Sequence, residues 1–159
     1  YEKDVGNLLI AFSKVQKTVS SKLLIVGDGP DRAKLKKIVN DLNINKKVSF
    51  LGFQSNPYPY FIKSDLLVLS STREGLPTVL IEALALGLKI VSTDCPSGPR
   101  EILNNGLYGK LVKMRNSSEL ANAIILSLKC KKPTIPKSIL DQYKVEKVVN
   151  LYTKLLSSH

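Results

Sequence analysis

The sequence predicts a doubly wound, Rossmann-like α/β fold, in which helices cover both faces of a parallel β-sheet. Short aliphatic runs alternate with helical patterns along the first 130 residues. The runs are nearly all apolar, as in parallel strands covered on both faces, whereas half-exposed strands alternate apolar and polar residues. Glycine or proline follows most of them, for example at Gly27, Gly52 and Pro96. This strand–helix alternation is typical of βαβ units with right-handed crossovers.

The elements follow in order along the chain. Val5, Leu8, Leu9, Phe12 and Val15 recur with the helical period and predict a first amphipathic helix over residues 5–19. Strands are expected over residues 22–26, 48–51, 66–69, 89–92 and 110–112. The other helices are expected over residues 31–42, 58–62, 78–86, 100–103 and 118–128. Residues 1–130 thus form an α/β core, followed by a Lys/Pro-rich linker over 131–143 and a last amphipathic helix over 144–158.

Composition limits the classes of function. With 43% apolar residues, the chain can bury the core of one globular domain. Its longest apolar stretch, residues 78–86, is interrupted by Glu82 and is far shorter than the roughly 20 residues that span a bilayer. Cys95 and Cys130 show no metal-ligand spacing, so neither a zinc site nor a disulfide framework is expected, and a reducing cytoplasm is assumed. The net charge of +11 favours polyanionic partners: nucleic acid, an anionic membrane or phosphorylated small molecules.

The segment from Glu74 to Glu82 carries the predicted chemistry. The helix that begins at Pro77 or Thr78 is apolar on every side and is therefore expected to be buried, yet it contains Glu82. An unpaired buried carboxylate would cost several kcal/mol. Glu82 must therefore be hydrogen-bonded by the protein, bind a ligand or reach the rim of the sheet, where ligands of open parallel sheets collect.

The start of the same helix is a predicted anion site. Its free amides, together with the helix dipole, favour a phosphate or pyrophosphate; they belong to Thr78, Val79 and Leu80. At about 1.5 Å per residue, Glu82 lies roughly 6–7 Å along the axis from Thr78, within reach of a ribose on that phosphate. Glu74 falls on the other side of the phosphate position. The two acids therefore bracket a diphosphate, between the nucleoside sugar and the transferred sugar.

Glu74 and Glu82, with seven residues between them, resemble the E-x7-E motif of retaining family-4 glycosyltransferases (glycosyl transferases group 1). The likeness covers nearly the whole chain; its further segments are 1–3, 11–12, 24–30, 48–52, 64–65, 94–102 and Gly109. The resemblance implies the C-terminal half of a two-domain GT-B architecture, with the N-terminal acceptor domain outside this chain. It also implies a UDP-, GDP- or similar nucleotide-sugar donor, no metal or other cofactor, and retention at the anomeric carbon.

The resemblance also implies roles for individual residues. Glu74 and Lys3 would be catalytic, with Glu74 on the donor sugar and Lys3 on the diphosphate. The arginine that accompanies such a lysine in the family is absent here. Glu82 would bind the ribose. The remaining donor-binding residues would be Gly75, Leu76, Thr78, Val79 and Leu80 at the phosphates and Gly27, Gly52 and Phe53 along the cleft. Pro77 departs from the commoner Glu-Gly-Phe-Gly form, which shifts the diphosphate contact by one amide.

The resulting hypothesis is the donor domain of a hexosyl- or N-acetylhexosaminyltransferase. It would act on a glycan or lipid-linked acceptor in cell-surface polysaccharide synthesis, in the cytoplasm or on the inner face of the cell membrane. The isolated domain is expected to be inactive, and no nucleic-acid partner is expected. Two alternatives stay open: a basic module that binds nucleic acid or membrane without catalysis, and a sugar-nucleotide epimerase. Arg100 is expected to form a surface ion pair.

Overall fold

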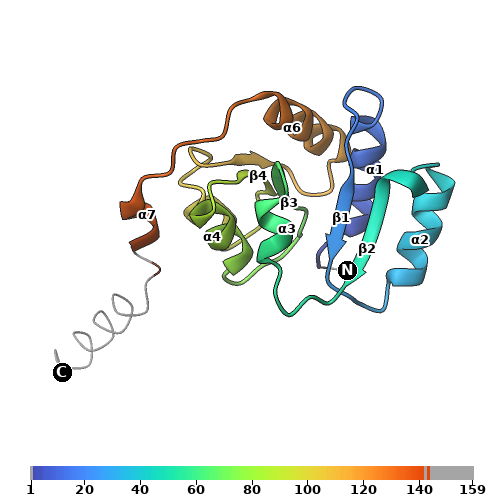
Figure 1. Ribbon diagram of the computed structural model, residues 1–159, viewed down its shortest axis with the longest axis horizontal. Coiled ribbons are helices and arrows are strands. Elements are labelled where there is room, and N and C mark those ends of the chain that lie inside the picture. Colours follow the sequence, from blue (N-terminus) through green and yellow to red (C-terminus); the bar gives the residue numbers. More distant parts are fainter. Residues whose placement is uncertain (1, 142, 144–159) are drawn as a thin grey trace.

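The computed structural model describes residues 2–141 and 143, which form an α/β domain (Figure 1). The strands are β1 (Leu23–Val26), β2 (Val48–Gly52), β3 (Leu66–Leu69), β4 (Lys89–Thr93) and β5 (Lys110–Val112). The helices are α1 (Val5–Val15), α2 (Arg32–Asp41), α3 (Tyr58–Ile62), α4 (Thr78–Ala85), α5 (Pro99–Ile102), α6 (Ser117–Lys129) and α7 (Lys137–Asp141), with a 3-10 turn, η1 (Asn45–Lys47). Every predicted strand and helix of the core is confirmed. The last helix, predicted over 144–158, lies outside the described residues.

All strand pairs are parallel, as predicted, but they form two sheets instead of one. Among the described residues, β1 pairs only with β2, while β4 lies between β3 and β5. β1 and β3 therefore each have one edge without a strand partner among the described residues. The parallel α/β fold is as predicted, and the two sheets are separate here because ladder hydrogen bonds need strands about 4.8 Å apart and no described segment joins these two edges.

The sheet of β3, β4 and β5 is covered on both faces, as the doubly wound prediction requires. Val91 of β4 belongs to a core cluster with α1 and α6, whereas its neighbour Ile90 belongs to a second cluster with α4 and α5. Successive strand residues point to opposite faces, so the two clusters lie on opposite sides of the sheet. β1 is different: Leu24 and Val26 are 40% and 39% exposed. One face of the smaller sheet is therefore open.

The predicted linker is partly wrong. The short helix α7 lies within residues 131–143, and Ile135, Leu140 and Tyr143 pack against the second cluster beside α4. The prediction relied on the Lys/Pro-rich composition of this stretch and did not take these apolar residues into account. Burial of these side chains offsets the loss of conformational entropy that accompanies ordering of the segment. A flexible linker would retain that entropy.

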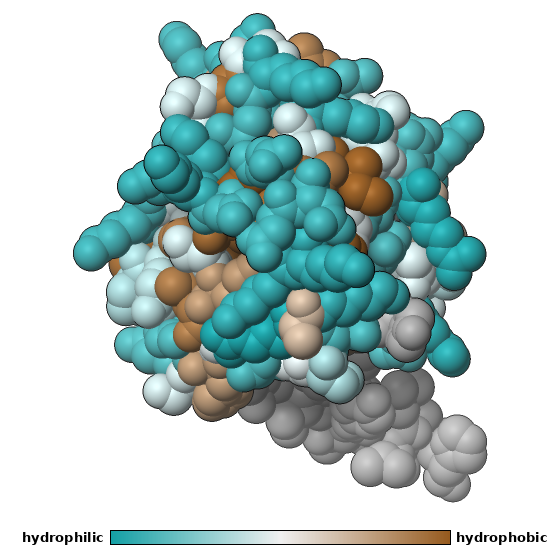
Figure 2. All heavy atoms as spheres, turned by 90° about the vertical axis from the view of Figure 1, so that its right-hand side faces the viewer, coloured by the Kyte–Doolittle hydropathy of each residue, from teal (hydrophilic) through white to brown (hydrophobic). Residues whose placement is uncertain are grey.

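The surface around α2 is largely hydrophilic (Figure 2). Only Val39 of α2 is buried, while Lys34, Lys36 and Lys37 are exposed. This is the solvated lysine face expected from the sequence. Among residues 2–141 and 143, no helix combines the length and apolar character needed to cross a membrane.

Candidate functional site

Glu74 and Lys3 meet at the end of β3, although 70 residues separate them in the sequence. Nζ of Lys3 donates to both carboxylate oxygens of Glu74, at 2.7 Å and 2.9 Å. The Glu74 side chain is 9% exposed and that of Lys3 is 64% exposed. The structure therefore brings the two predicted catalytic residues together, as an ion pair with a shielded acid and a solvent-facing cation.

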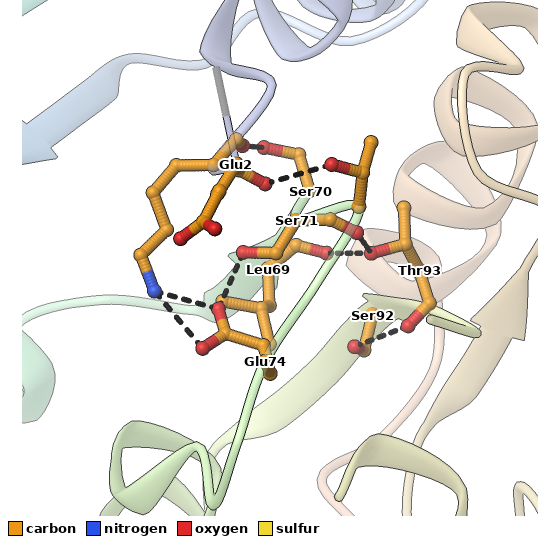
Figure 3. Close-up of polar contacts among 9 residues, drawn as sticks. Glu2, Leu69, Ser70, Ser71, Glu74, Ser92 and Thr93 are labelled. Atoms are coloured by element: carbon orange, nitrogen blue, oxygen red, sulfur yellow. Dashed lines mark hydrogen bonds and ion pairs between the residues drawn. The ribbon is translucent and has the colours of Figure 1, made fainter. Parts of the chain in front are cut away.

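Three consecutive residues after β3 organise this pair (Figure 3). Ser70 donates from Oγ to the Lys3 carbonyl at 2.7 Å, and the Thr72 amide donates to the Glu2 carbonyl at 2.7 Å. Ser71 donates from Oγ to Oε1 of Glu74 at 2.5 Å. The prediction from sequence missed these residues. The available signal was a run of hydroxyl residues that directly follows an apolar strand.

Glu82 lies on α4 and differs from Glu74. Its side chain is half-buried, and no hydrogen bond or ion pair to it is found within the described part of the chain. Its oxygens are also absent from the buried polar atoms that lack a partner. Of the three alternatives for this acid, internal satisfaction is therefore excluded among these residues. Glu82 reaches the surface and is available to a ligand.

The start of α4 offers fewer free amides than predicted. Thr78 donates its amide to the Leu76 carbonyl at 2.9 Å, and Leu80 donates to the Pro77 carbonyl at 2.9 Å. The prediction that all three amides are free is wrong for these two, because the tight turn at Pro77 folds local carbonyls back onto the helix start. For Val79 no acceptor is found among the described residues. Gly75 and Leu76 are exposed in the loop that leads to the helix.

Gly98 fixes the position of that loop from the neighbouring strand exit. Its φ is +92°, and a Cβ atom there would lie 2.9 Å from the Gly75 carbonyl oxygen and would also collide with the Pro77 side chain. Only glycine fits such a close approach in this backbone conformation. Cys95 is buried in the same exit, and burial raises the pKa of its thiol, with a further rise from the negative charge of Glu74.

The predicted cleft residues of the smaller sheet also lie at strand ends. The Gly27 amide donates to the Gly52 carbonyl at 2.8 Å, and both glycines have positive φ. Phe53 follows them and is 79% exposed. The β1 and β2 arrows point to the side of the molecule where α1 begins (Figure 1). Lys3, just before α1, therefore lies at the same rim as these residues.

A hollow of about 440 Å³ lies between the ends of β4 and β5 and touches neither Glu74 nor Glu82. Arg100 pairs with Asp94 at its wall, which confirms the predicted surface ion pair. Glu119 accepts the Lys113 amide and the Asn116 side chain there. These charged groups are satisfied internally, so the predicted site stays at the β3 exit. In the described part of the chain no group of His, Cys, Asp and Glu could hold a metal ion.

Comparison with known proteins gives a consistent result. Residues 1–143 match the family model for glycosyl transferases group 1. The N-acetyl-alpha-D-glucosaminyl L-malate synthase of Bacillus anthracis is 33% identical over 156 residues, which cover 94% of this chain and 41% of that protein. The N-acetylgalactosamine-N,N'-diacetylbacillosaminyl-diphospho-undecaprenol 4-alpha-N-acetylgalactosaminyltransferase of Campylobacter jejuni is 35% identical over 118 residues, 74% of this chain and 32% of that protein.

Solved structures agree. The apo lipopolysaccharide outer core galactosyltransferase WaaB superposes with a TM-score of 0.84 at 27% identity, over 100% of this chain and 46% of that chain. The complex of Anabaena Alr3699/HepE with UDP and glucose superposes with a TM-score of 0.81 at 24% identity, over 96% of this chain and 44% of that chain. The second likeness concerns the fold alone.

The fold and the structural neighbours first define the class: the chain has the α/β fold of a domain of GT-B glycosyltransferases. It belongs to the family of glycosyl transferases group 1. The chain spans less than half the length of these relatives and structures.

Replacing Gly98 with alanine tests the contact between the two strand exits. We expect Gly98→Ala to lower the free energy of unfolding by about 2–4 kcal/mol, because the Cβ collides with the Gly75–Pro77 loop and the positive φ is strained. Urea unfolding measures the change. Gly29→Ala is the matched control, since its Cβ meets nothing within 4 Å. Equal losses in the two variants would contradict the proposed contact.

The two cysteines should differ in reactivity. Cys95 is buried and its pKa is raised, so a smaller fraction of its thiol ionises at a given pH, whereas Cys130 is exposed. We expect iodoacetamide at pH 8 to alkylate Cys130 at least about tenfold faster than Cys95 in the native protein. Peptide mass spectrometry over time reads both sites, and urea should abolish the difference. Similar native rates would show that the β4 exit is open to reagents.

Proposed function

We propose that the chain is the donor-binding domain of a retaining, metal-independent glycosyltransferase. The observation that carries the proposal is the placement of Glu74, Glu82 and Lys3 around the start of α4, the first paired with a cation and the second without a protein partner among the described residues. Its curated relatives include an N-acetylglucosaminyl L-malate synthase and an N-acetylgalactosaminyltransferase. A structural neighbour was crystallised with UDP and glucose.

In this proposal each group has one task. Glu82 accepts hydrogen bonds from the hydroxyl groups of the ribose. The Val79 amide and the Lys3 ammonium meet the diphosphate, where negative charge grows as the bond to the sugar breaks. Preorganised donors of this kind stabilise such charge strongly in a shielded site, and here they take the place of a metal ion. When the diphosphate binds Lys3, Glu74 is released from its ion pair and accepts hydrogen bonds from hydroxyl groups of the transferred sugar.

The acceptor is proposed to be a glycan or a lipid-linked sugar of the cell surface, bound by a second domain. The unpaired edges of β1 and β3 support the idea that polypeptide outside residues 1–159 joins this domain. Both strands pack on the α1 cluster, and the Glu2 carbonyl is bonded to Thr72 just beyond β3. Polypeptide that enters here can form a parallel strand between the two edges and merge the sheets. A cytoplasmic location is proposed from the two isolated cysteines, and a place beside an anionic membrane from the net charge of +11.

Nucleotide binding tests the proposal directly. In isothermal titration of the native-length protein with UDP, GDP and ADP, we expect one of them to bind saturably, with EDTA causing no change. Glu82→Ala should weaken binding of that nucleotide by about tenfold or more, because the ribose loses a charged hydrogen-bond acceptor.

Glu101→Ala provides the control, since Glu101 is an exposed acid on α5. If no nucleotide binds while DNA or anionic vesicles bind with steep salt dependence, the proposal fails and the basic-module alternative gains support.

Amide hydrogen exchange tests the open edges. Residues 1–159 alone should exchange their β1 and β3 edge amides at least about tenfold faster than the native-length protein, because a strand that joins both edges would protect them. The amides of β4 provide the control, since that strand already has partners on both sides. Equal exchange in both samples would refute a strand between the edges.

A further inference from the structure

Buried polar side chains gather at one place in this domain. Among the described residues, five polar side chains are buried, and four of them lie at the ends of β3 and β4: Ser70, Ser71, Ser92 and Thr93. The fifth, Ser127, lies on α6. A buried hydroxyl is unfavourable unless it is hydrogen-bonded. This concentration therefore needs an explanation in terms of what the hydroxyls hold.

The hydroxyls form a short relay toward Glu74 (Figure 3). Thr93 donates from Oγ1 to the Ser71 carbonyl at 2.5 Å, across the β3–β4 pair. Ser71 in turn donates from Oγ to Oε1 of Glu74 at 2.5 Å. Both Ser71 and Thr93 are fully buried, so neither has water as an alternative partner. The backbone of one strand exit thus fixes the carboxylate of the next loop.

This arrangement makes the two carboxylate oxygens of Glu74 unequal. Oε1 accepts from both Ser71 and Lys3, which uses its two lone pairs, whereas among the described residues Oε2 accepts only from Lys3. Ser71 is buried and Lys3 is largely exposed, so the ligand can move Lys3 but not Ser71. Oε2 is therefore the oxygen that remains open to a sugar hydroxyl.

We propose that Ser71 is a positioning residue of the donor-sugar subsite, which orients Glu74 through the hydrogen bond to Oε1 and presents Oε2 to the transferred sugar. The inference rests on the proposed function and deepens it. Ser71 touches no ligand and acts only through Glu74. Its loss should affect recognition of the sugar and leave recognition of the nucleotide diphosphate unchanged.

Titration calorimetry of the native-length protein tests the role of Ser71. The probes are UDP, GDP and ADP together with UDP-glucose, UDP-galactose, UDP-N-acetylglucosamine, GDP-mannose and ADP-glucose. We expect Ser71→Ala to weaken binding of the nucleotide-sugar that the wild type binds by about tenfold, and binding of the matching free nucleotide by less than about twofold. Ser92→Ala is the matched control: Ser92 is equally buried, and its hydroxyl donates to the Thr93 carbonyl without touching Glu74. It should leave both affinities unchanged.

A double-mutant cycle separates positioning from a general structural effect. In a Glu74→Ala background, Ser71→Ala should cause no further loss of affinity for the nucleotide-sugar, because the carboxylate through which Ser71 acts is gone. Thermal unfolding of each variant confirms that it is folded before titration.

The outcomes distinguish the two levels of the argument. Wild-type protein that binds none of these nucleotides and nucleotide-sugars would overturn the proposed function and this inference with it. Wild-type binding together with equal weakening of the free nucleotide and its nucleotide-sugar by Ser71→Ala would overturn the inference alone. So would an equal effect of Ser92→Ala, or a full further loss in the Glu74→Ala background.

Discussion

The hydrogen bond from the Thr93 hydroxyl to the Ser71 carbonyl ties the ends of β3 and β4 together at the point where the site begins. Both residues are fully buried, so this bond is shielded from water, and it is much shorter than the second contact of the same hydroxyl, 3.4 Å to the Leu69 carbonyl. The orientation of the Glu74 carboxylate depends on where Ser71 lies, because Ser71 donates to its Oε1. A buried polar contact between two strands thereby determines where a charged group at the surface lies.

The loop before α4 is held from the other side by Gly98. The β4 exit can approach the Gly75–Pro77 turn only because Gly98 lacks a side chain and adopts a positive φ. Pro77 closes the same turn so tightly that the Thr78 and Leu80 amides bond local carbonyls. These bonds reduce the number of amides at the helix start that are free to bind an anion. Under the proposed function, more of the positive charge near the diphosphate must therefore come from the Lys3 ammonium.

The two acids of the motif occupy unlike surroundings although they frame one short segment. Glu74 is shielded and already paired with a cation, so a ligand must compete for it. Glu82 is half-buried and has no protein partner in the described part of the chain, so its carboxylate can accept hydrogen bonds without breaking an existing one. Under the proposed function, the ribose can therefore bind Glu82 directly, whereas the sugar must displace Lys3 from Glu74.

The sequence by itself determined the succession of strands and helices, the parallel pairing and the segment that carries the acids, because these follow from local periodicity and from residue types near one another in the chain. The hydroxyl relay, the glycine contact at residue 98 and the meeting of Lys3 with Glu74 join residues far apart in sequence, and only the tertiary structure decided them. The same holds for the division into two sheets: apolar runs predict strands, but edge pairing depends on which strands lie within hydrogen-bonding distance.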